Sequence, residues 1–344
     1  MNTNNRRLPA EWESQQAVLI AWPHKLTDWN YMLEEVTGCY ISMAEAIVPF
    51  CPLIIVTPDQ QEVKPLLSHL PQERITYFET DTNDTWIRDY GPITTVDDNG
   101  RLFLNDFKFN AWGLKFAANL DNLVTKRMHK AGILSGEYVN RLGFVLEGGS
   151  IESDGNGTLL TTSECLMSPN RNGDLSQEQI TEHLKEYLGV SKVLWLDHGA
   201  LDGDDTDSHI DTLARLAPND TIIYVTTTPD DPQYPALEAM QRQLQEFTTV
   251  SGQPFNLIGL PLPHPIYDPD DPGQRLPATY ANYLVTDKAV IMPSYGQPKP
   301  DLLAAQILKI AYPCHDIVPV DCRALIRQHG SLHCATMQIP KSEH

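Results

Sequence analysis

No run of apolar residues in this sequence approaches the ~18 that a membrane-spanning helix needs. The polar start, MNTNNRRLPAEW, has no apolar stretch after its two arginines, which argues against a secretory signal. We therefore expect a cytoplasmic protein without a membrane partner.

Cysteine is scarce, and the spacing of the cysteines shows no pairing motif. Six cysteines are spread over 344 residues, and none forms a Cys-x-x-Cys pair. This excludes a disulfide scaffold, which is typical of short secreted chains. Most of the six are expected to be small buried apolar residues, and one or more remains a candidate nucleophile.

Basic residues are few compared with acidic ones. Lys plus Arg is 25 and Asp plus Glu is 45, which gives a formal net charge of -20. A field of that sign repels nucleic acid and anionic membranes and attracts cationic ligands. Solubility alone would also explain it.

A repeated pattern runs along the chain. Its first part is an apolar run, a polar turn and a second apolar run, which predicts a β-hairpin. The hairpins are expected at Gly91–Phe107, Gly148–Leu166, Ile210–Val225 and Tyr283–Pro293. Helices with three- and four-residue apolar spacing follow at Leu120–Ala131, Gln177–Tyr187, Ala236–Phe247 and Leu302–Ala311. Short strands then follow at Phe144–Leu146, Val193–Leu196, Phe255–Leu260 and Ile317–Val320.

The N-terminal region supplies a fifth, incomplete copy. It has a strand (Val18–Trp22), a helix (Tyr31–Val48), a strand (Leu53–Val56) and an additional helix and strand (Glu62–Phe78). Its hairpin partner is predicted to be the strand after Cys334, from the other end of the chain. Repeated units must pack on one another to bury their apolar faces. The prediction is a single α/β domain over residues 1–344, a five-bladed pseudo-symmetric α/β propeller of hairpin-helix-strand units, with flexible tails at 1–8 and 341–344. A doubly wound sheet is the alternative, but the hairpins count against it.

Reactive side chains gather in the polar loops that lead into the hairpins. They are Asp84, Trp86, Arg88, Asp89, Glu147, His209, Asp211, His333 and Cys334. In a ring, these loops would meet at one end of the axis. A thiolate is a nucleophile, histidine is an acid and base near neutral pH, and carboxylates suit the N–H donors of a guanidinium. Attack of a cysteine on a guanidinium carbon fits this set.

Each residue also has a simpler interpretation. Cys334 alone is more often a core residue. His209 and Asp211 could lie on a solvated strand face. Glu147-Gly148-Gly149 could be an exposed turn, and Arg88 could form a buried salt bridge. Two metal sites are further alternatives, a divalent cation on Asp202, Asp204, Asp205 and Asp207, and zinc on His329, His333 and Cys334, but neither spacing is a recognised one.

Together, these segments resemble the agmatine deiminases and bacterial peptidylarginine deiminases, within the guanidino-group modifying enzymes. The matching segments are Pro9-Ala10-Glu11-Trp12, Trp86-Ile87-Arg88-Asp89-Tyr90-Gly91-Pro92, Glu147-Gly148-Gly149, His209-Ile210-Asp211 and Leu332-His333-Cys334. They occur in family order over nearly the whole chain. The resemblance implies the pentein-like five-bladed propeller.

The resemblance also implies roles for these residues. Cys334 would attack the guanidinium carbon, and His209 would protonate the departing ammonia and then activate water. Asp89 and Asp211 would hold the guanidinium nitrogens, Glu147 would orient His209 or assist binding, and Trp86 would line the pocket. No metal or organic cofactor is implied. The expected reaction converts agmatine to N-carbamoylputrescine and ammonia, a step in putrescine biosynthesis.

Two positions depart from the agmatine pattern. The family usually has Gly-Gly-Asn-Ile-His-Cys, where this chain has His329 followed by Gly330-Ser331-Leu332-His333-Cys334, and it usually has Gly where Ser208 precedes His209. The substrate therefore stays open between agmatine and peptidyl or other substituted arginine. Amidino transfer to an amine and non-catalytic binding of an arginine-like ligand are further alternatives. A homodimer is the expected assembly, since dimers are the commonest oligomers.

Overall fold

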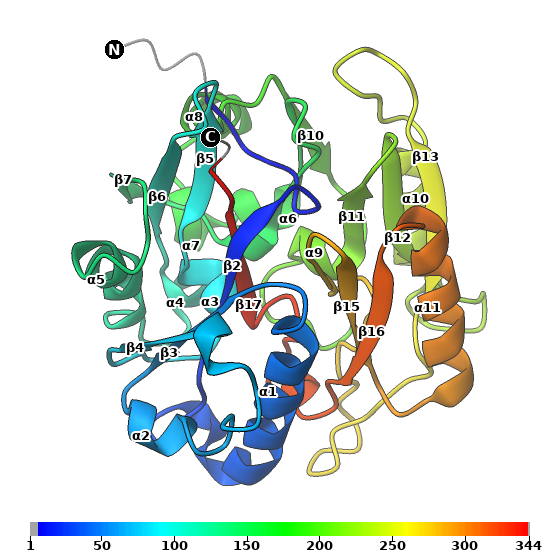
Figure 1. Cartoon of the computed structure of the whole chain (residues 1–344). Coiled ribbons are helices and arrows are strands. Elements are labelled where there is room, and N and C mark those ends of the chain that lie inside the picture. The colour runs from blue at the N-terminus through cyan, green and yellow to red at the C-terminus, as the bar shows by residue number, and fades with distance from the viewer. Residues whose placement is uncertain (1–5, 343–344) are drawn as a thin grey trace.

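The computed structural model describes residues 6–342 and has a mixed α/β fold with five separate sheets (Figure 1). Three sheets have three strands and two have four. The strand orders are β1-β5-β6-β7, β10-β9-β8, β11-β12-β13, β14-β15-β16 and β17-β2-β3-β4.

The sheets share one construction, which the third shows most simply. Strands β11 (Ala214–Ala217) and β12 (Thr221–Thr226) form an antiparallel hairpin, and α10 (Tyr234–Leu244) leads to β13 (Asn256–Pro261), parallel to β12. The turn contains Asn219 and Asp220, both with positive φ. Such a turn matches the right-handed twist of the strands that it joins.

Three other sheets repeat this order. The first has β5 (Ile93–Asp97), β6 (Leu102–Lys108), α5 (Val124–Lys130) and β7 (Glu137–Val145). The second has β8 (Ile151–Ser153), β9 (Thr158–Thr162), α8 (Gln177–Leu188) and β10 (Lys192–Leu196). The fourth has β14 (Leu284–Val285), β15 (Ala289–Ser294), α11 (Pro298–Ala311) and β16 (Asp316–Asp321). The four predicted hairpins are therefore confirmed.

The fifth sheet joins the two ends of the chain. Strand β17 (Thr336–Pro340) pairs antiparallel with β2 (Gln15–Ala21), with Met337 opposite Leu19. Helix α1 (Leu33–Ile47) then leads to β3 (Leu53–Thr57), and β4 (Ile75–Glu79) lies parallel beyond it. The predicted pairing of the strand after Cys334 with the N-terminal strand is confirmed.

Some boundaries differ from the prediction. Strand β7 begins seven residues before the predicted Phe144, because most of this strand is only partly buried and lacks a continuous apolar run. The helix expected within Glu62–Phe78 is a single turn, α2 (Gln60–Val63). Of the predicted tails, residues 1–5 and 343–344 lie outside the described residues, whereas Arg6 and Arg7 form β1, which pairs with β5.

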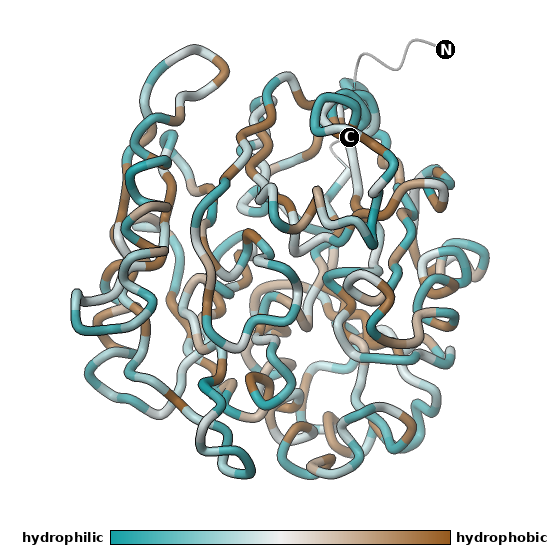
Figure 2. The backbone as a smooth tube through the Cα atoms, turned by 180° about the vertical axis from the view of Figure 1, so that it is seen from behind, coloured by the Kyte–Doolittle hydropathy of each residue, from teal (hydrophilic) through white to brown (hydrophobic). Residues whose placement is uncertain are grey.

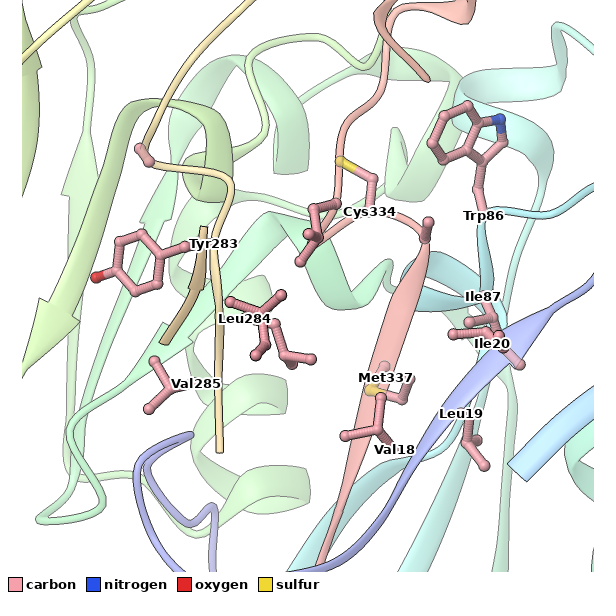
Figure 3. Close-up of a cluster of buried hydrophobic side chains, with 14 of the residues drawn as sticks. Val18, Leu19, Ile20, Trp86, Ile87, Tyr283, Leu284, Val285, Cys334 and Met337 are labelled. Atoms are coloured by element: carbon pink, nitrogen blue, oxygen red, sulfur yellow. The ribbon is translucent and has the colours of Figure 1, made fainter. Parts of the chain in front are cut away.

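Long helices such as α1 and α11 lie toward the outside of the molecule, whereas several short helical turns lie nearer its middle (Figure 1). The tube in Figure 2 shows apolar segments running through the interior and polar segments in the outer loops. Figure 3 shows Cys334 just before β17, with Met337 further along, on the strand that pairs with β2. The nucleophile candidate thus stands at the edge of a packed apolar core. Among residues 6–342, no helix has the length and apolarity to cross a membrane.

Candidate active site

Each of the five units contributes polar side chains from the same place, just before the first strand of its hairpin. Asp89 lies in the turn α3 (Ile87–Tyr90) before β5, and Glu147 lies before β8. His209 and Asp211 lie at the turn α9 (Ile210–Leu213) before β11, Asn282 lies before β14, and Cys334 lies before β17. The repeat therefore brings residues far apart in sequence to one location.

Cys334 is buried, and two polar groups approach its sulfur. Asn282 Nδ2 donates to Cys334 Sγ over 3.2 Å, and Asp211 Oδ2 lies 3.8 Å from the same atom. Burial, together with the negative charges of Asp211 and Asp89, raises the pKa of the Cys334 thiol well above its usual range. These effects favour the neutral thiol at Cys334.

His209 is fully buried between two carboxylates. Its Nε2 lies 3.2 Å from Glu147 Oε2, and its Nδ1 lies 3.8 Å from Asp89 Oδ1. Burial lowers the pKa of His209, but the Asp89 charge, Cys165 and the Glu147 hydrogen bond outweigh it, so the pKa lies well above the usual value. An imidazolium at this position can donate a proton to a leaving group.

Asp89 is fixed by two N–H donors. The backbone N–H of Gly149 donates to Oδ1 over 2.9 Å, and Trp112 Nε1 donates to Oδ2 over 2.9 Å. Burial raises the pKa of Asp89 to about 6; the His209 charge opposes this effect and the Glu147 charge adds to it. Gly149 cannot carry a side chain, because a Cβ there would lie 2.6 Å from His209 Nδ1 and 2.9 Å from Asp89 Oδ1. This explains the second glycine of the Glu-Gly-Gly segment.

Asp211 has one engaged and one unengaged oxygen. His333 Nδ1 lies 2.7 Å from Oδ2, whereas Oδ1 is buried and has no hydrogen-bond partner among residues 6–342. Burial raises the pKa of Asp211, but the hydrogen bond and charge of His333 outweigh it, so the pKa is below its usual value. A charged carboxylate with a free oxygen suits an N–H donor of a cationic ligand.

His333 is held from its other side by the N-terminal segment. Its Nε2 lies 2.7 Å from Glu11 Oε2, and Arg215 binds both Glu11 and Glu152. Arg88, expected in a salt bridge, lies 3.8 Å from Glu11 and also donates to Gln338. Glu11 of the Pro-Ala-Glu-Trp segment therefore helps to position Asp211 through His333 and does not line the cavity.

Arg171 is a site residue that the sequence did not reveal. It lies in α7 (Pro169–Asn172) with its side chain fully buried, and its Nε donates to Glu147 Oε2 over 2.8 Å. Its other nitrogens reach Asp207 and the carbonyl of Thr206. Burial raises the pKa of Glu147, but the hydrogen bond from His209 and the charge of Arg171 outweigh it and lower the pKa.

A cavity of about 240 Å³ opens above Cys334 and Asp89. Its walls are aromatic and acidic, and they comprise Asp28, Tyr31, Asp84, Trp86, Trp112, Phe116, Asp205, Thr206, Arg327, Gln328, His329 and Gly330. Trp86 lies on the cavity wall, and Gly330 lets the indole ring approach, since a Cβ there would lie 2.3 Å from it.

The neighbouring turn α4 (Ala111–Leu114) holds Trp112 in an unusual backbone conformation. Its four residues all have positive φ, which makes it left-handed. Non-glycine residues adopt this conformation at a cost and most often at functional sites. The hydrogen bond from Trp112 to Asp89 depends on it.

One structural expectation from the sequence is corrected. His209 and Asp211 do not lie on a strand face, because residues 210–213 form a helical turn. Residues 87–90, which contain Asp89, also form a single helical turn, α3. Single helical turns of four residues are too short to show helical periodicity in a sequence.

The arrangement of donors matches neither of the two metal sites that the sequence left open. His329 Nδ1 contacts the carbonyl of Gly203, and both nitrogens of His333 face carboxylates, so these histidines do not join Cys334 as zinc ligands. In the acidic loop, Asp207 pairs with Lys115 and Arg171.

Two other groups among the described residues have metal-ligand spacing. They are Glu147, Cys165 and His209, and Glu11, Glu152 and His333. In each group a glutamate already binds an arginine, Arg171 or Arg215. Neither group therefore fits a further cation.

The two departures from the agmatine pattern have a shared geometry. Ser208 has φ 60 and His329 has φ 66, the left-handed region that glycine adopts without strain. The Ser208 hydroxyl donates to Glu164 Oε2 over 2.9 Å, and the Ser208 backbone N–H donates to Asp204 Oδ2 over 2.7 Å. Both residues that replace glycine in the pattern therefore adopt a backbone conformation that glycine favours.

Comparison with known proteins decides the family. The model of the Porphyromonas-type peptidyl-arginine deiminases matches residues 7–340. The chain belongs to this family. Within this deiminase family, the agmatine deiminase of Stutzerimonas stutzeri is 34% identical over 97% of this chain and 95% of the relative.

Solved structures agree with this placement in the deiminase family. A serine variant of the C. jejuni agmatine deiminase with substrate bound is 38% identical, with a TM-score of 0.90 over 98% of this chain and 97% of that one. A candidate arginine deiminase from Porphyromonas gingivalis is 48% identical, with a TM-score of 0.91 over 98% of this chain and 99% of that one. The mixed α/β fold is therefore shared with agmatine deiminase structures, and the resemblance inferred from the motifs is confirmed.

Proposed function

We propose that the protein is a hydrolase of C–N bonds in linear amidines that converts agmatine to N-carbamoylputrescine and ammonia, a step toward putrescine. The observation that carries this proposal is the geometry around Cys334. A nucleophile candidate, two carboxylates and a protonated histidine meet below a cavity with acidic and aromatic walls. Relatives named as agmatine deiminases cover nearly the whole chain.

The guanidinium enters between Asp89 and Asp211. Its planar N–H groups donate to the free oxygen of Asp211 and to Asp89, which suits bidentate binding by carboxylates. Its positive charge offsets the two negative charges that raise the pKa of the Cys334 thiol. Substrate binding therefore favours formation of the thiolate that attacks.

The reaction then proceeds in two halves. The sulfur of Cys334 bonds to the guanidinium carbon, and the C–N bond to the terminal nitrogen breaks as His209 transfers its proton to the leaving ammonia. A covalent amidino-cysteine remains. Water then attacks the same carbon, gives a proton to His209, and releases the ureido product as the C–S bond breaks. No metal or organic cofactor takes part in this scheme.

The acidic residues of the cavity wall favour a free amine over a peptide. Asp28, Asp84 and Asp205 lie on this wall with Phe116 and Tyr31, and Arg327, which also lines it, pairs with Asp268 and Asp270. The distal ammonium of agmatine would find carboxyl groups there, whereas a peptide backbone offers no cation. Peptidyl arginine is the alternative substrate, and amidino transfer to an amine is a lower one.

We also propose a propeller arrangement of the five sheets, a cellular location and an assembly. The five sheets form the blades of one propeller in a single domain, supported by their common topology and by the equivalent position of the site residues in each unit. The acidic chain works as a cytoplasmic homodimer on a small cationic substrate, without nucleic acid or membrane partners.

Product analysis tests this proposal. Purified protein is incubated with agmatine, free arginine or a blocked arginine peptide, and ammonia and the ureido product are measured. Turnover of agmatine that is lost in Cys334→Ala supports the proposal, and turnover of the peptide alone replaces it with peptide deimination. Addition of a primary amine separates hydrolysis from amidino transfer, because transfer yields a new guanidine.

A further inference from the structure

We propose that Arg327 is a specificity-determining residue and that Asp268 and Asp270 set its effect by neutralising its charge. With Arg327 neutralised, the site takes a guanidine whose far end is an ammonium. With Arg327 unpaired, the site would favour a guanidine whose far end is a carboxylate. The proposal rests on the proposed function and deepens it, because it names the class of substrate that is rejected, the guanidino acids.

Arg327 lies on the wall of the catalytic cavity, together with Asp28, Asp84 and Asp205. Arginine keeps its positive charge inside proteins, so this side chain repels the ammonium that the neighbouring carboxyl groups attract. An arginine at this place therefore works against a cationic substrate unless its charge is compensated. The ion pairs of Arg327 provide that compensation.

Two aspartates of one loop hold the guanidinium of Arg327. Its Nη2 lies 2.5 Å from Asp270 Oδ2 and 3.4 Å from Asp268 Oδ1. The side chains of Arg327 and Asp268 are 18% and 15% exposed, whereas the side chain of Asp270 is 82% exposed. Solvent screens an exposed charge more strongly than a buried one. Asp268 should therefore contribute more to the neutralisation than Asp270.

The loop that carries the two aspartates, residues 266–276, is fixed by hydrogen bonds. Within it, the N–H of Asp268 donates to the carbonyl of Gln274 over 2.9 Å. Arg275 donates to Asp231, which precedes α10, through two hydrogen bonds of 2.8 and 2.9 Å. The loop therefore holds both carboxylates at one place beside the cavity.

The side chain of Arg327 borders open space on two sides. Besides the catalytic cavity, it lines a second cavity of about 530 Å³, whose other walls include α1 and the 266–276 loop. The ion pairs, rather than packing on every side, therefore keep the guanidinium in place. Its Nε is buried and has no hydrogen-bond partner among residues 6–342. An unpaired Arg327 thus has donors for a substrate carboxylate, the acceptor that a guanidinium binds best.

Binding measurements test the proposal without requiring turnover. Every protein carries Cys334→Ser, and isothermal titration calorimetry gives Kd for agmatine, δ-guanidinovalerate and butylguanidine. The three guanidines have chains of similar length that end in an ammonium, a carboxylate and a methyl group. The test variant is Asp268→Asn/Asp270→Asn, which keeps the size of both side chains and leaves Arg327 without a charged partner.

We expect the test variant to bind agmatine roughly tenfold more weakly and δ-guanidinovalerate roughly tenfold more tightly, the effect of about one unit charge several ångströms away in a partly solvated site. Butylguanidine, which has no charge at that end, should change by less than about twofold. Asp268→Asn alone should have a larger effect than Asp270→Asn alone. Adding Arg327→Gln to the test variant should remove the gain for the carboxylate, because no unpaired cation remains.

The control is Asp271→Asn, a change in the same loop. Asp271 is exposed and its Oδ1 accepts from the N–H of Gly273, so the variant removes a loop charge and leaves the pairs of Arg327 intact. The ratio of Kd for agmatine to Kd for δ-guanidinovalerate should stay the same in this control.

An unchanged Kd ratio in Asp268→Asn/Asp270→Asn would overturn the proposal. So would a full shift that persists with Arg327→Gln, because the loop charge alone would then explain it, or an equal loss of binding for all three guanidines, because the loop would then only support the cavity. If no protein binds any of the three, both this proposal and the proposed function fall. The proposed function fails by itself if the unmodified protein releases no ammonia from agmatine although the Kd ratio shifts as expected.

Discussion

Replacement of Arg171 by methionine should be among the most damaging single changes in this protein. The guanidinium of Arg171 is fully buried and binds Glu147, Asp207 and the carbonyl of Thr206. Methionine fills similar volume but leaves the Glu147 carboxylate buried with only His209 and Cys165 beside it among the described residues. Breaking a buried ion pair by removing one partner costs about 3–5 kcal/mol, because a charge is left without compensation.

The expected shift in melting temperature follows from the size of the chain. An unfolding entropy of about 2.1 cal/mol/K per residue gives about 0.7 kcal/mol/K for a chain of this length. A loss of about 3–5 kcal/mol therefore lowers Tm by roughly 4–7 °C. The second change Glu147→Gln removes the stranded charge, so Arg171→Met/Glu147→Gln should recover at least half of this loss.

Thermal denaturation followed by circular dichroism measures these shifts. The control is Arg323→Met, because Arg323 pairs with Asp321 in solvent, where an ion pair contributes at most about 1 kcal/mol. A decrease for Arg171→Met no larger than for Arg323→Met would refute the reasoning. So would a double variant less stable than Arg171→Met alone.

Three other outcomes are expected. Burial raises the pKa of Asp89 to about 6, so this carboxyl is charged above that pH and protonated below it. In steady-state kinetics, KM for agmatine should therefore rise as pH falls from 7 to 5, by up to about tenfold per pH unit. Ser208→Gly should change the free energy of unfolding by less than about 1 kcal/mol, and Ser208→Val should lower it by about 2 kcal/mol or more in urea titration, since valine resists positive φ. Asp205→Asn should raise KM for agmatine about tenfold and leave KM unchanged for an alkylguanidine that lacks the distal ammonium. Equal effects on both substrates would show that Asp205 does not bind the amine.

The sequence was most informative where local chemistry determines structure. Polar turns such as Pro218-Asn219-Asp220 predicted the hairpins, because few residues adopt the positive φ that these turns require. The pairing of β17 with β2 followed from counting units, since an incomplete copy at one end needed a partner strand.

The same sequence was uninformative where structure depends on distant contacts. Arg171 lies in Pro169-Asn170-Arg171-Asn172, which has the composition of a solvated turn, and only the fold brings Glu147 to it. Asn282 follows Thr279-Tyr280-Ala281, a segment without charge or motif. Its position in the fourth unit, equivalent to those of the predicted site residues, was the signal that could have identified it.

Trapping of the covalent intermediate tests the central claim most directly. The protein is mixed with agmatine, quenched in acid within one turnover, and its intact mass and Cys334 peptide are measured. The account predicts a mass increase equal to agmatine less ammonia, located on Cys334 and absent from Cys334→Ser. Steady release of ammonia and ureido product by Cys334→Ser at the unmodified rate, or an adduct on another residue, would contradict it.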